Sequence, residues 1–413
     1  MTSVLGCPVT HGQRKTIREN EVAEPGVSVE NGVWHIRSLP VVAQVLRDGR
    51  NTVQAGFNAE YVRRDGIGKL PILFLDGEEH RDQRSKIARY FAPKTVGNKY
   101  RGFMEKRAAE LVDRIIEYGE VELSDVALRY SVEVAAQVIG LGDAEMRGMS
   151  ARLEAFFSTP VLAPSPADGP KASRFDSIVM SMRGTASVSA FYLRDVRPAI
   201  RRRRKKPAED VISHLLAEGY DDQGILTECI VYGAAGMVTT REFISMAAWH
   251  FVEKPELRAR FLAGDEAERR GLLLELLRLE PIVGHLYRHA TAPMTLVDGD
   301  QTYEVPEGAL LDLYVRMANA DPDHVGPEPL EICPGRDLPP RVRDEVMSFG
   351  DGGHRCPGNH IAMQEADIFL GLLFAHEVEL VSEPRIQWDD LIAGYEVRNI
   401  RLRVRPGGGG AAG

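Results

Sequence analysis

The chain has 413 residues, of which 44 % are hydrophobic and 27 % charged, a composition typical of a globular protein with one large or two ordinary domains. The net charge of −9 argues against a general nucleic-acid role, which needs a basic surface. The four cysteines are too widely spaced to predict a disulfide framework or a zinc site. No stretch of about 18 apolar residues predicts a membrane span, and residues 1–18 lack the core of a signal peptide, so we expect a cytoplasmic protein.

The first third of the chain combines a predicted hairpin, a long loop and a charged helix. Alternating residues and turn residues predict a hairpin over Val27–Ile36, and a short helix follows over Leu39–Leu46. Residues 52–75 resemble a long loop with weak helical pieces, and such loops inside compact domains are usually functional. In the next helix, His80 and Arg84 lie four residues apart on one face, so together they can hold carboxylate groups.

The middle of the chain is predicted to be helical. Amphipathic patterns indicate helices over Phe103–Tyr118 and Val126–Ile139. A long apolar pattern without proline predicts a central helix from about Leu226 to Val252. Gly233 and Gly236 lie inside it, and each costs about 1 kcal/mol relative to alanine. They therefore suggest either the close approach of a flat ligand or a local widening of the helix.

The last third alternates short helices with strands. A short helix over Leu272–Leu279 carries Glu275 and Arg278, whose spacing of three residues lets them pair on one side. Met294–Val305 is predicted to be a hairpin, Ile361–Phe374 an amphipathic helix, and Ile386–Val404 a set of strands.

The most distinctive stretch is the glycine-rich loop at 349–358, which reads Phe-Gly-Asp-Gly-Gly-His-Arg-Cys-Pro-Gly. Its glycines let the backbone curl tightly, so that several N–H groups can converge on one anion. A thiolate at Cys356 would be that anion, and the positive N-terminal end of the following helix favours it as well.

This loop resembles the haem-ligand loop of the cytochrome P450 superfamily, Phe-x-x-Gly-x-His-x-Cys-x-Gly, at every fixed position. Other family stretches follow in the same order: His-x-x-x-Arg at 80–84, Ala-Gly-x-x-Thr-Thr at 235–240, Glu-x-x-Arg at 275–278 and Ala-Asn-x-Asp-Pro at 318–322. The resemblance implies one catalytic domain over residues 1–406, mainly α with small β-sheets, and a flexible tail over 407–413. In this fold, haem b lies between the long central helix and the cysteine loop.

The resemblance also implies roles for individual residues. Cys356 would be the axial ligand of the haem iron, and Thr239 would bind dioxygen and the water that supplies it with protons. The cofactor-binding residues would be His80, Arg84, Arg288, Phe349, His354, Cys356 and Gly358, among which the two histidines and two arginines would contact the haem propionates. The catalytic candidates are Gly236, Thr239, Thr240 and Glu242. A structural triad would consist of Glu275, Arg278 and Arg336. Candidates for the substrate pocket are Phe57, Tyr61, Phe74, Met237, Val238, Val283 and Ile392.

One departure concerns proton supply, because Val238 stands where the family usually has an acid, and valine cannot shuttle protons. Glu242 lies one turn later and is a possible substitute, although it is displaced by about 6 Å along the helix axis. Substrate hydroxyls or ordered water are the other possible sources.

The resemblance implies a monooxygenase that activates O2 to hydroxylate a medium-sized hydrophobic molecule, such as a biosynthetic intermediate. Electrons would come from a separate ferredoxin and ferredoxin reductase. Radical coupling, or another non-hydroxylating oxidation, is the alternative that Val238 suggests. Two other classes stay open: a non-catalytic haem-thiolate sensor or carrier, and a non-haem enzyme with Cys356 as nucleophile and His354 as base.

Overall fold

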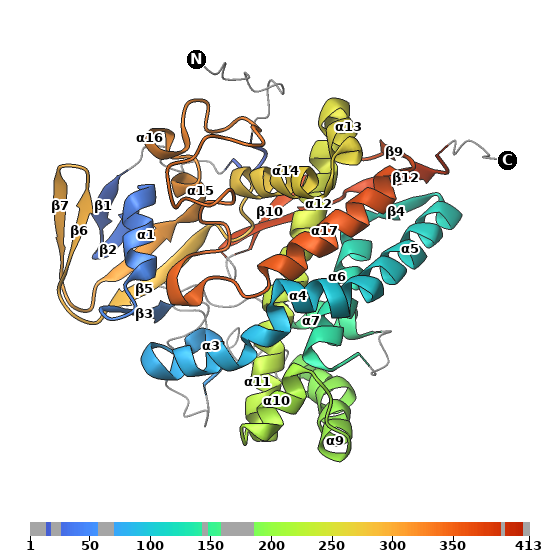
Figure 1. Cartoon of the computed structure of the whole chain (residues 1–413), viewed down its shortest axis with the longest axis horizontal. Coiled ribbons are helices and arrows are strands. Elements are labelled where there is room, and N and C mark those ends of the chain that lie inside the picture. Colours follow the sequence, from blue (N-terminus) through green and yellow to red (C-terminus); the bar gives the residue numbers. More distant parts are fainter. Residues whose placement is uncertain are drawn as a thin grey trace, which may run out of the picture.

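The computed structural model describes residues 14–17, 26–56, 70–142, 148–157, 186–389 and 393–407, and helices dominate this part of the chain (Figure 1). The longer helices are α3 Gly77–Phe91, α5 Arg101–Tyr118, α6 Leu123–Ile139, α11 Asp222–Gly233, α12 Thr239–Glu253, α14 Glu266–Leu279 and α17 Asn359–Phe374. The shorter ones are α1 Leu39–Arg47, α4 Pro93–Thr95, α7 Met149–Phe157, α9 Arg197–Lys205, α10 Val211–Ala217, α13 Pro255–Ala263, α15 Val315–Ala318 and α16 Pro322–Val325.

The described strands form small sheets. The largest has five strands in the order β1-β2-β8-β5-β3, a second has the order β4-β12-β9, and β6-β7 and β10-β11 are antiparallel pairs. The bounds are β1 Val27–Glu30, β2 Val33–Ile36, β3 Thr52–Ala55, β4 Glu120–Glu122, β5 His285–Ala290, β6 Met294–Asp298, β7 Gln301–Val305, β8 Leu310–Tyr314, β9 Glu377–Leu380, β10 Arg385–Asp389, β11 Gly394–Arg398 and β12 Arg401–Arg405. The expected class, mainly α with small β-sheets, is confirmed.

Two hydrophobic cores meet at the cysteine loop. The larger core joins the long helices through fully buried side chains such as Phe251 and Phe369, and the smaller core packs α1 on the five-stranded sheet. Burial of one such side chain contributes about 1.5–3 kcal/mol. Met347 belongs to the smaller core, whereas Phe349 packs against the larger one, so the loop begins at their boundary. Figure 1 shows it running between the sheet end of the molecule and α17.

The long central helix is present, with one irregularity. Between α11 and α12, residues Ala234–Val238 form a π-helical turn, which widens the helix locally. The helical path thus continues through the glycines of the sequence Gly-Ala-Ala-Gly. Of the two explanations offered for these glycines, the local widening is confirmed.

Some sequence expectations need correction. Residues 52–75 are not a loop throughout, because Thr52–Ala55 is strand β3 and pairs antiparallel with β5. The four-residue strand was missed because two of its residues, Thr52 and Gln54, are polar yet buried. The helix that carries Glu275 begins at Glu266, where Asp265 and Glu268 form a capping box. None of the described helices is both long and apolar enough to cross a membrane.

Candidate functional site

The cysteine loop is held by its own backbone and by α1. The Cys356 N–H donates to the Phe349 carbonyl oxygen at 2.8 Å, which closes the loop. Gly352 has φ +65°, and a Cβ there would lie 2.0 Å from the Leu46 carbonyl oxygen, so only glycine fits. Asp351 accepts hydrogen bonds from the Gly352 N–H at 2.8 Å and from Arg47 Nε at 2.7 Å. The loop is therefore fixed in place by long-range contacts as well as by its own turn.

The surroundings of the Cys356 sulfur act on its pKa in opposite directions. Burial raises the pKa of the thiol, while the Gly358 and Asn359 N–H groups and the nearby Arg84 act in the opposite direction. The effect of burial is the larger one, so the neutral thiol is favoured unless a cation binds the sulfur. A metal ion deprotonates a coordinating thiol outright. The predicted convergence of N–H groups on this sulfur is confirmed for Gly358 and Asn359.

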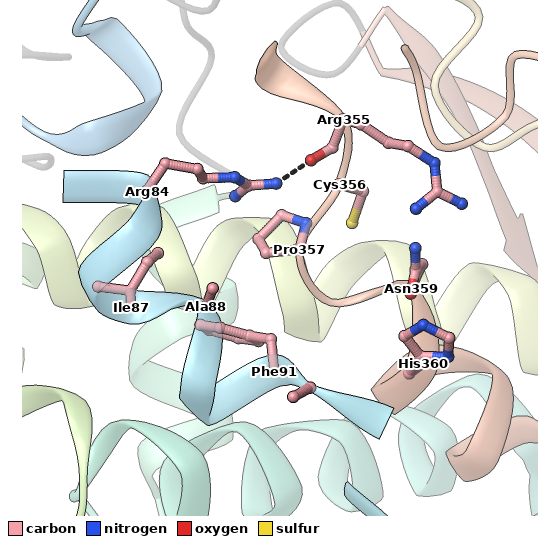
Figure 2. Close-up of a pocket in the computed structure, with 10 residues that line it drawn as sticks. Arg84, Ile87, Ala88, Phe91, Arg355, Cys356, Pro357, Asn359 and His360 are labelled. Atoms are coloured by element: carbon pink, nitrogen blue, oxygen red, sulfur yellow. Dashed lines mark hydrogen bonds between the residues drawn. The ribbon is translucent and has the colours of Figure 1, made fainter. Parts of the chain in front are cut away.

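A pocket of about 230 Å³ opens beside Cys356, between α3 and the start of α17. Figure 2 shows the side chains that line it, with Arg84 reaching across from α3 to the Arg355 carbonyl oxygen, to which it donates a hydrogen bond. The lining residues are Arg84, Ile87, Ala88, Phe91, Ala92, Arg355, Cys356, Pro357, Asn359 and His360. Ile87, Ala88 and Phe91 form an apolar wall on α3. Basic side chains lie closer to the cysteine loop, namely Arg84, Arg355 and His360.

Four side chains able to carry positive charge lie near one another beside the same loop. The His80 ring stacks on His354, with 3.9 Å between centroids, and His354 Nε2 lies 3.4 Å from Asp76 Oδ1. Burial lowers the pKa of His80 to about 4, and repulsion from His354 and Arg84 adds to this. Burial also lowers the pKa of Arg288 to about 10 and lowers the pKa of Arg84 and of His354.

This cation cluster, defined as His80, Arg84, Arg288 and His354, lacks matching negative charge. In the described part of the chain, Asp76 is the carboxylate that raises the pKa of the two histidines and of Arg288, yet each pKa stays below its ordinary value. A dianionic group would offset the repulsion. Haem carries two propionates, so these residues, together with the Cys356 sulfur, fit haem.

The central helix contributes a polar hydroxyl within an open stretch. The Thr239 hydroxyl donates to the Ala235 carbonyl oxygen at 2.5 Å, and Ala235 is exposed although it lies mid-helix. Thr240 and Val238 are buried, and Gly236 is half-buried. Because the Thr239 hydroxyl donates its proton to the Ala235 carbonyl oxygen, the Thr239 oxygen can still accept a hydrogen bond from a ligand or water.

Glu242 lies in a network that ties the central helix to β11. It is fully buried, and it accepts hydrogen bonds from Arg241 at 2.5 Å, from the Val397 N–H at 2.6 Å and from Arg398 at 2.9 Å. Arg241 also reaches Glu396 at 3.0 Å. Both Glu242 oxygens thus have cationic or amide partners, an arrangement that stabilises an ionised carboxylate.

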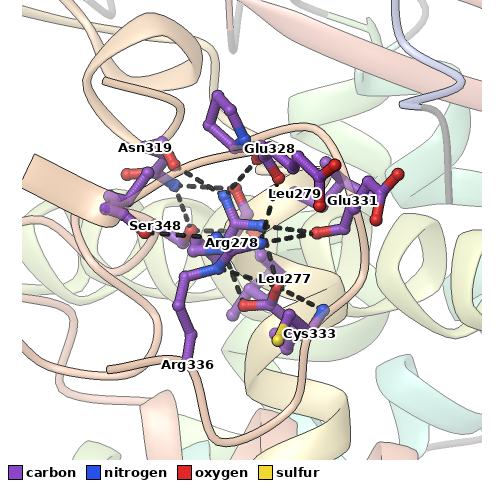
Figure 3. Close-up of polar contacts among 12 residues, drawn as sticks. Leu277, Arg278, Leu279, Asn319, Glu328, Glu331, Cys333, Arg336 and Ser348 are labelled. Atoms are coloured by element: carbon purple, nitrogen blue, oxygen red, sulfur yellow. Dashed lines mark hydrogen bonds and ion pairs between the residues drawn. The ribbon is translucent and has the colours of Figure 1, made fainter. Parts of the chain in front are cut away.

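The structure brings both Arg278 and Arg336 to Glu275. Figure 3 shows the two arginines within the surrounding network of polar contacts. Arg278 is fully buried and donates to both Glu275 oxygens, at 2.6 and 2.8 Å, and to the Asn319 carbonyl oxygen at 2.8 Å. Arg336 Nε lies 3.4 Å from Glu275. Asn319 Nδ2 donates to the Ser348 hydroxyl at 2.8 Å, directly before the cysteine loop. This network therefore connects α14 to the loop.

The residues predicted to line the substrate pocket differ in burial, and three of them lie outside the described part of the chain. Phe57, Tyr61 and Ile392 lie outside the described residues. Phe74 is buried, and Val283 is half-buried and bridges to Gly394. Met237 is fully buried and lies near Gly233 and Leu153, which places it in the larger core.

Sequence reasoning missed two polar residues near this site. Gln54 on β3 accepts a hydrogen bond from Arg288, and Asp76 accepts the Gln54 N–H at 3.0 Å. Asp76 carried one usable signal, since it stands directly before a predicted helix start. Gln54 carried none, because its partner is 234 residues away.

A family model described as Cytochrome P450 matches residues 271–387. A protein named Putative cytochrome P450 123 from Mycobacterium tuberculosis is 28 % identical over 364 residues, which cover 83 % of this chain and 81 % of that protein. Cyclomarin C epoxidase CymV from Salinispora arenicola is 27 % identical over 350 residues, which cover 83 % and 82 %.

A comparison with solved structures also finds cytochrome P450 enzymes of similar fold. The crystal structure of the versatile cytochrome P450 enzyme CYP109B1 from Bacillus subtilis superposes with a TM-score of 0.72 at 22 % identity. The match covers 91 % of this chain and 95 % of that one. At this identity the likeness concerns the fold alone.

Proposed function

This chain belongs to the cytochrome P450 superfamily and is a monooxygenase, and on that premise we propose that it holds haem b through Cys356 and oxidises a medium-sized hydrophobic molecule. The observation that carries the proposal is the cation cluster beside the cysteine loop, which is short of negative charge. Cys356 would supply the thiolate ligand, and the cluster would bind the two propionates. When bound, the haem supplies the O2 chemistry, and a thiolate ligand favours cleavage of the O–O bond.

The chain's own residues would position the reactants and control protons. Thr239 would accept a hydrogen bond from water on the exposed side of the central helix, next to Gly236. Val238 would exclude water where an acid is usual. We assign Glu242 a structural part, because Arg241, Arg398 and the Val397 N–H occupy both of its oxygens and tie the central helix to β11. Water or a substrate hydroxyl would then bring the protons.

The Glu275–Arg278–Arg336 network would have no direct part in the chemistry. Arg278 would support Ser348 through Asn319, and hence the position of the cysteine loop. Phe349 would pack against the haem from the start of that loop.

The substrate class rests on the predicted lining and on named relatives. Phe74 and Val238 are apolar, as are the candidates Phe57 and Ile392. The similar proteins include a cyclomarin C epoxidase and a biotin biosynthesis cytochrome P450, so we propose a biosynthetic intermediate as substrate. The protein would act in the cytoplasm. Neither nucleic acid nor a membrane would take part in binding its hydrophobic substrate.

Electrons would come from a separate ferredoxin and its reductase. The face around the pocket beside Cys356 supports docking of an acidic protein, since Arg84 lines it and Arg81 is exposed nearby on α3. Arg355 also lines it but is paired with Glu345 at 2.6 Å. Lys86 contributes less, because Asp82 and Glu218 already pair with it at 2.9 and 2.7 Å.

The test is turnover of the haem-loaded protein with a ferredoxin, its reductase and NADPH under ¹⁸O2. Compounds are first selected by the shift of the haem spectrum that substrate binding causes. Hydroxylation consumes O2, two electrons and two protons and places one labelled oxygen atom in the product. Radical coupling, the alternative that Val238 favours, removes two hydrogen atoms from the substrate and leaves the product unlabelled. A protein that binds haem but turns over none of the spectrally active compounds would support a sensor or carrier instead.

A further inference from the structure

Glu228 is a buried carboxyl that the proposed chemistry does not use. It lies on α11, is 2 % exposed, and its Oε1 accepts the Ile72 N–H at 3.0 Å. Its Oε2 is buried and has no hydrogen-bond partner among the described residues. Buried polar atoms are rarely left without a partner, so this one calls for an explanation.

The partner of Glu228 belongs to a short segment that leads into the cofactor site. Residues 70–76, named here the entry segment, contain the turn Ile72–Phe74 and end at Asp76, directly before α3. Ile72 and Phe74 are both buried. At the far end of the segment, Asp76 holds the Gln54 N–H at 3.0 Å and lies 3.4 Å from His354.

The entry segment is thus fixed by two carboxyl groups in different surroundings. Asp76 lies among the cation cluster, which stabilises a negative charge. Glu228 has no such support, because no described cation contributes to its pKa, and burial raises that pKa from 4.5 to about 8. The groups around it are neutral when protonated, and burial raises the pKa of each: Tyr220, Cys229 and Tyr232. The charged groups beyond them are Glu79, Arg84, Lys86 and Glu218, which act on Tyr220 or Tyr232, and Asp210, which acts on Cys229.

A neutral carboxyl fits a site that has no cationic partner among the described residues, because burying it costs less than burying a charge. Since Oε1 accepts the Ile72 N–H, the proton resides on Oε2, the oxygen without a described partner. The side chain then joins α11 to the entry segment with no buried charge.

We propose that Glu228, as a neutral carboxyl, is the positioning residue that holds the entry segment against the central helix, and that its ionisation releases the segment. The importance of this contact for catalysis rests on the proposed function, because Phe74 would border the substrate and α3 carries two of the propionate contacts. The contact itself does not depend on haem.

The sign of the pH dependence follows from the two states of the segment. In the closed state Glu228 is buried and its pKa is about 8, whereas in an open, hydrated state it returns to about 4.5. Between these values the open state has lost its proton and the closed state keeps it, so opening becomes about tenfold more favourable per pH unit. Below pH 4.5 and above pH 8 the dependence disappears.

Amide hydrogen exchange measures this opening in the haem-loaded protein. The protection factor of the peptide that covers residues 72–76 is compared at pH 5.5 and 7.5, after correction for intrinsic exchange rates. The wild type should lose about 100-fold in protection over this range. Glu228→Gln keeps the acceptor for Ile72 but cannot ionise, so its protection should be independent of pH. Strand β8 serves as an internal reference, because it should respond equally in both proteins.

Glu365→Gln is the matched control. Glu365 is also buried with a raised pKa and an unpartnered Oε2, but it lies on α17, where its side chain interacts with Ser131 and not with the entry segment. This variant should keep the pH dependence at residues 72–76. Equal pH dependence in the wild type and in Glu228→Gln would overturn the proposal. Failure of the proposed function is separate, since it would show as absence of a haem-thiolate spectrum with exchange behaviour unchanged.

Discussion

Replacement of Arg278 by methionine tests how strongly the cysteine loop depends on the network behind it. Methionine keeps most of the buried volume but removes the charge and every hydrogen bond of the guanidinium. In the wild type these bonds reach both Glu275 oxygens and the carbonyl oxygens of Asn319, Pro329 and Glu331, at 2.6–3.1 Å.

The cost can be worked out from these contacts. Loss of one partner of a buried ion pair costs about 3–5 kcal/mol. The Glu331 carbonyl oxygen still accepts a hydrogen bond from Arg336. The carbonyl oxygens of Asn319 and Pro329 each lose the hydrogen bond from Arg278, and each loss costs about 1–3 kcal/mol. The sum is about 5–11 kcal/mol, comparable with the whole stability of a typical domain, about 5–15 kcal/mol. The Arg278→Met protein should therefore be largely unable to fold or to retain haem.

The assay is urea unfolding followed by far-UV circular dichroism and by the haem absorbance. Arg278→Lys should fall between the two proteins, because it keeps the charge and loses the two-pronged contact with Glu275. Arg343→Met is the matched control, since Arg343 is half-exposed and pairs with Asp351 at 3.2 Å, which is worth at most about 1 kcal/mol. An Arg278→Met protein that unfolds at the wild-type urea concentration, with its haem bound, would refute the reasoning.

Three further outcomes are expected. Thr239→Val should uncouple O2 consumption from product formation, measured by an oxygen electrode and product analysis, because valine cannot accept a hydrogen bond; full coupling would exclude Thr239 from proton supply. Glu242→Gln should lower the urea midpoint by loosening Arg398 while leaving coupling intact, and the reverse pattern would make Glu242 the proton donor. The His80 pKa, about 4 before haem binds, should rise when the propionates arrive, so haem binding should take up protons and strengthen as pH falls from 7 toward 5. His80→Gln should remove that part of the pH dependence of haem affinity, and an unchanged dependence would place the propionates elsewhere.

The parts of the site that are contiguous in the sequence could be predicted from it. The cysteine loop, the Ala-Gly-x-x-Thr-Thr stretch and Glu275–Arg278 each fit within about ten residues, and local backbone chemistry fixes their form. Helix positions also followed from apolar periodicity, and the glycines of the central helix indicated its wide turn.

The remaining features depend on pairs that are distant in the chain. Glu228 meets Ile72 across 156 residues, and Glu242 meets Arg398 across 156 residues. Neither apolar periodicity nor residue spacing predicts a contact between such distant residues. From the sequence alone, a glutamate in a helix that is buried without a charged partner cannot be distinguished from one that pairs with an arginine. Strand β3 was missed for a related reason, because its polar residue Gln54 is buried against a distant arginine.

The most direct measurement of the central claim is the absorption spectrum of the reduced protein with carbon monoxide. With haem held by the Cys356 thiolate, the wild type should show the long-wavelength Soret band from which the family takes its name. Cys356→His should bind haem without that band, whereas Cys333→Ser should keep it. A protein that takes up no haem, or a Cys356→His variant that retains the band, would contradict the account.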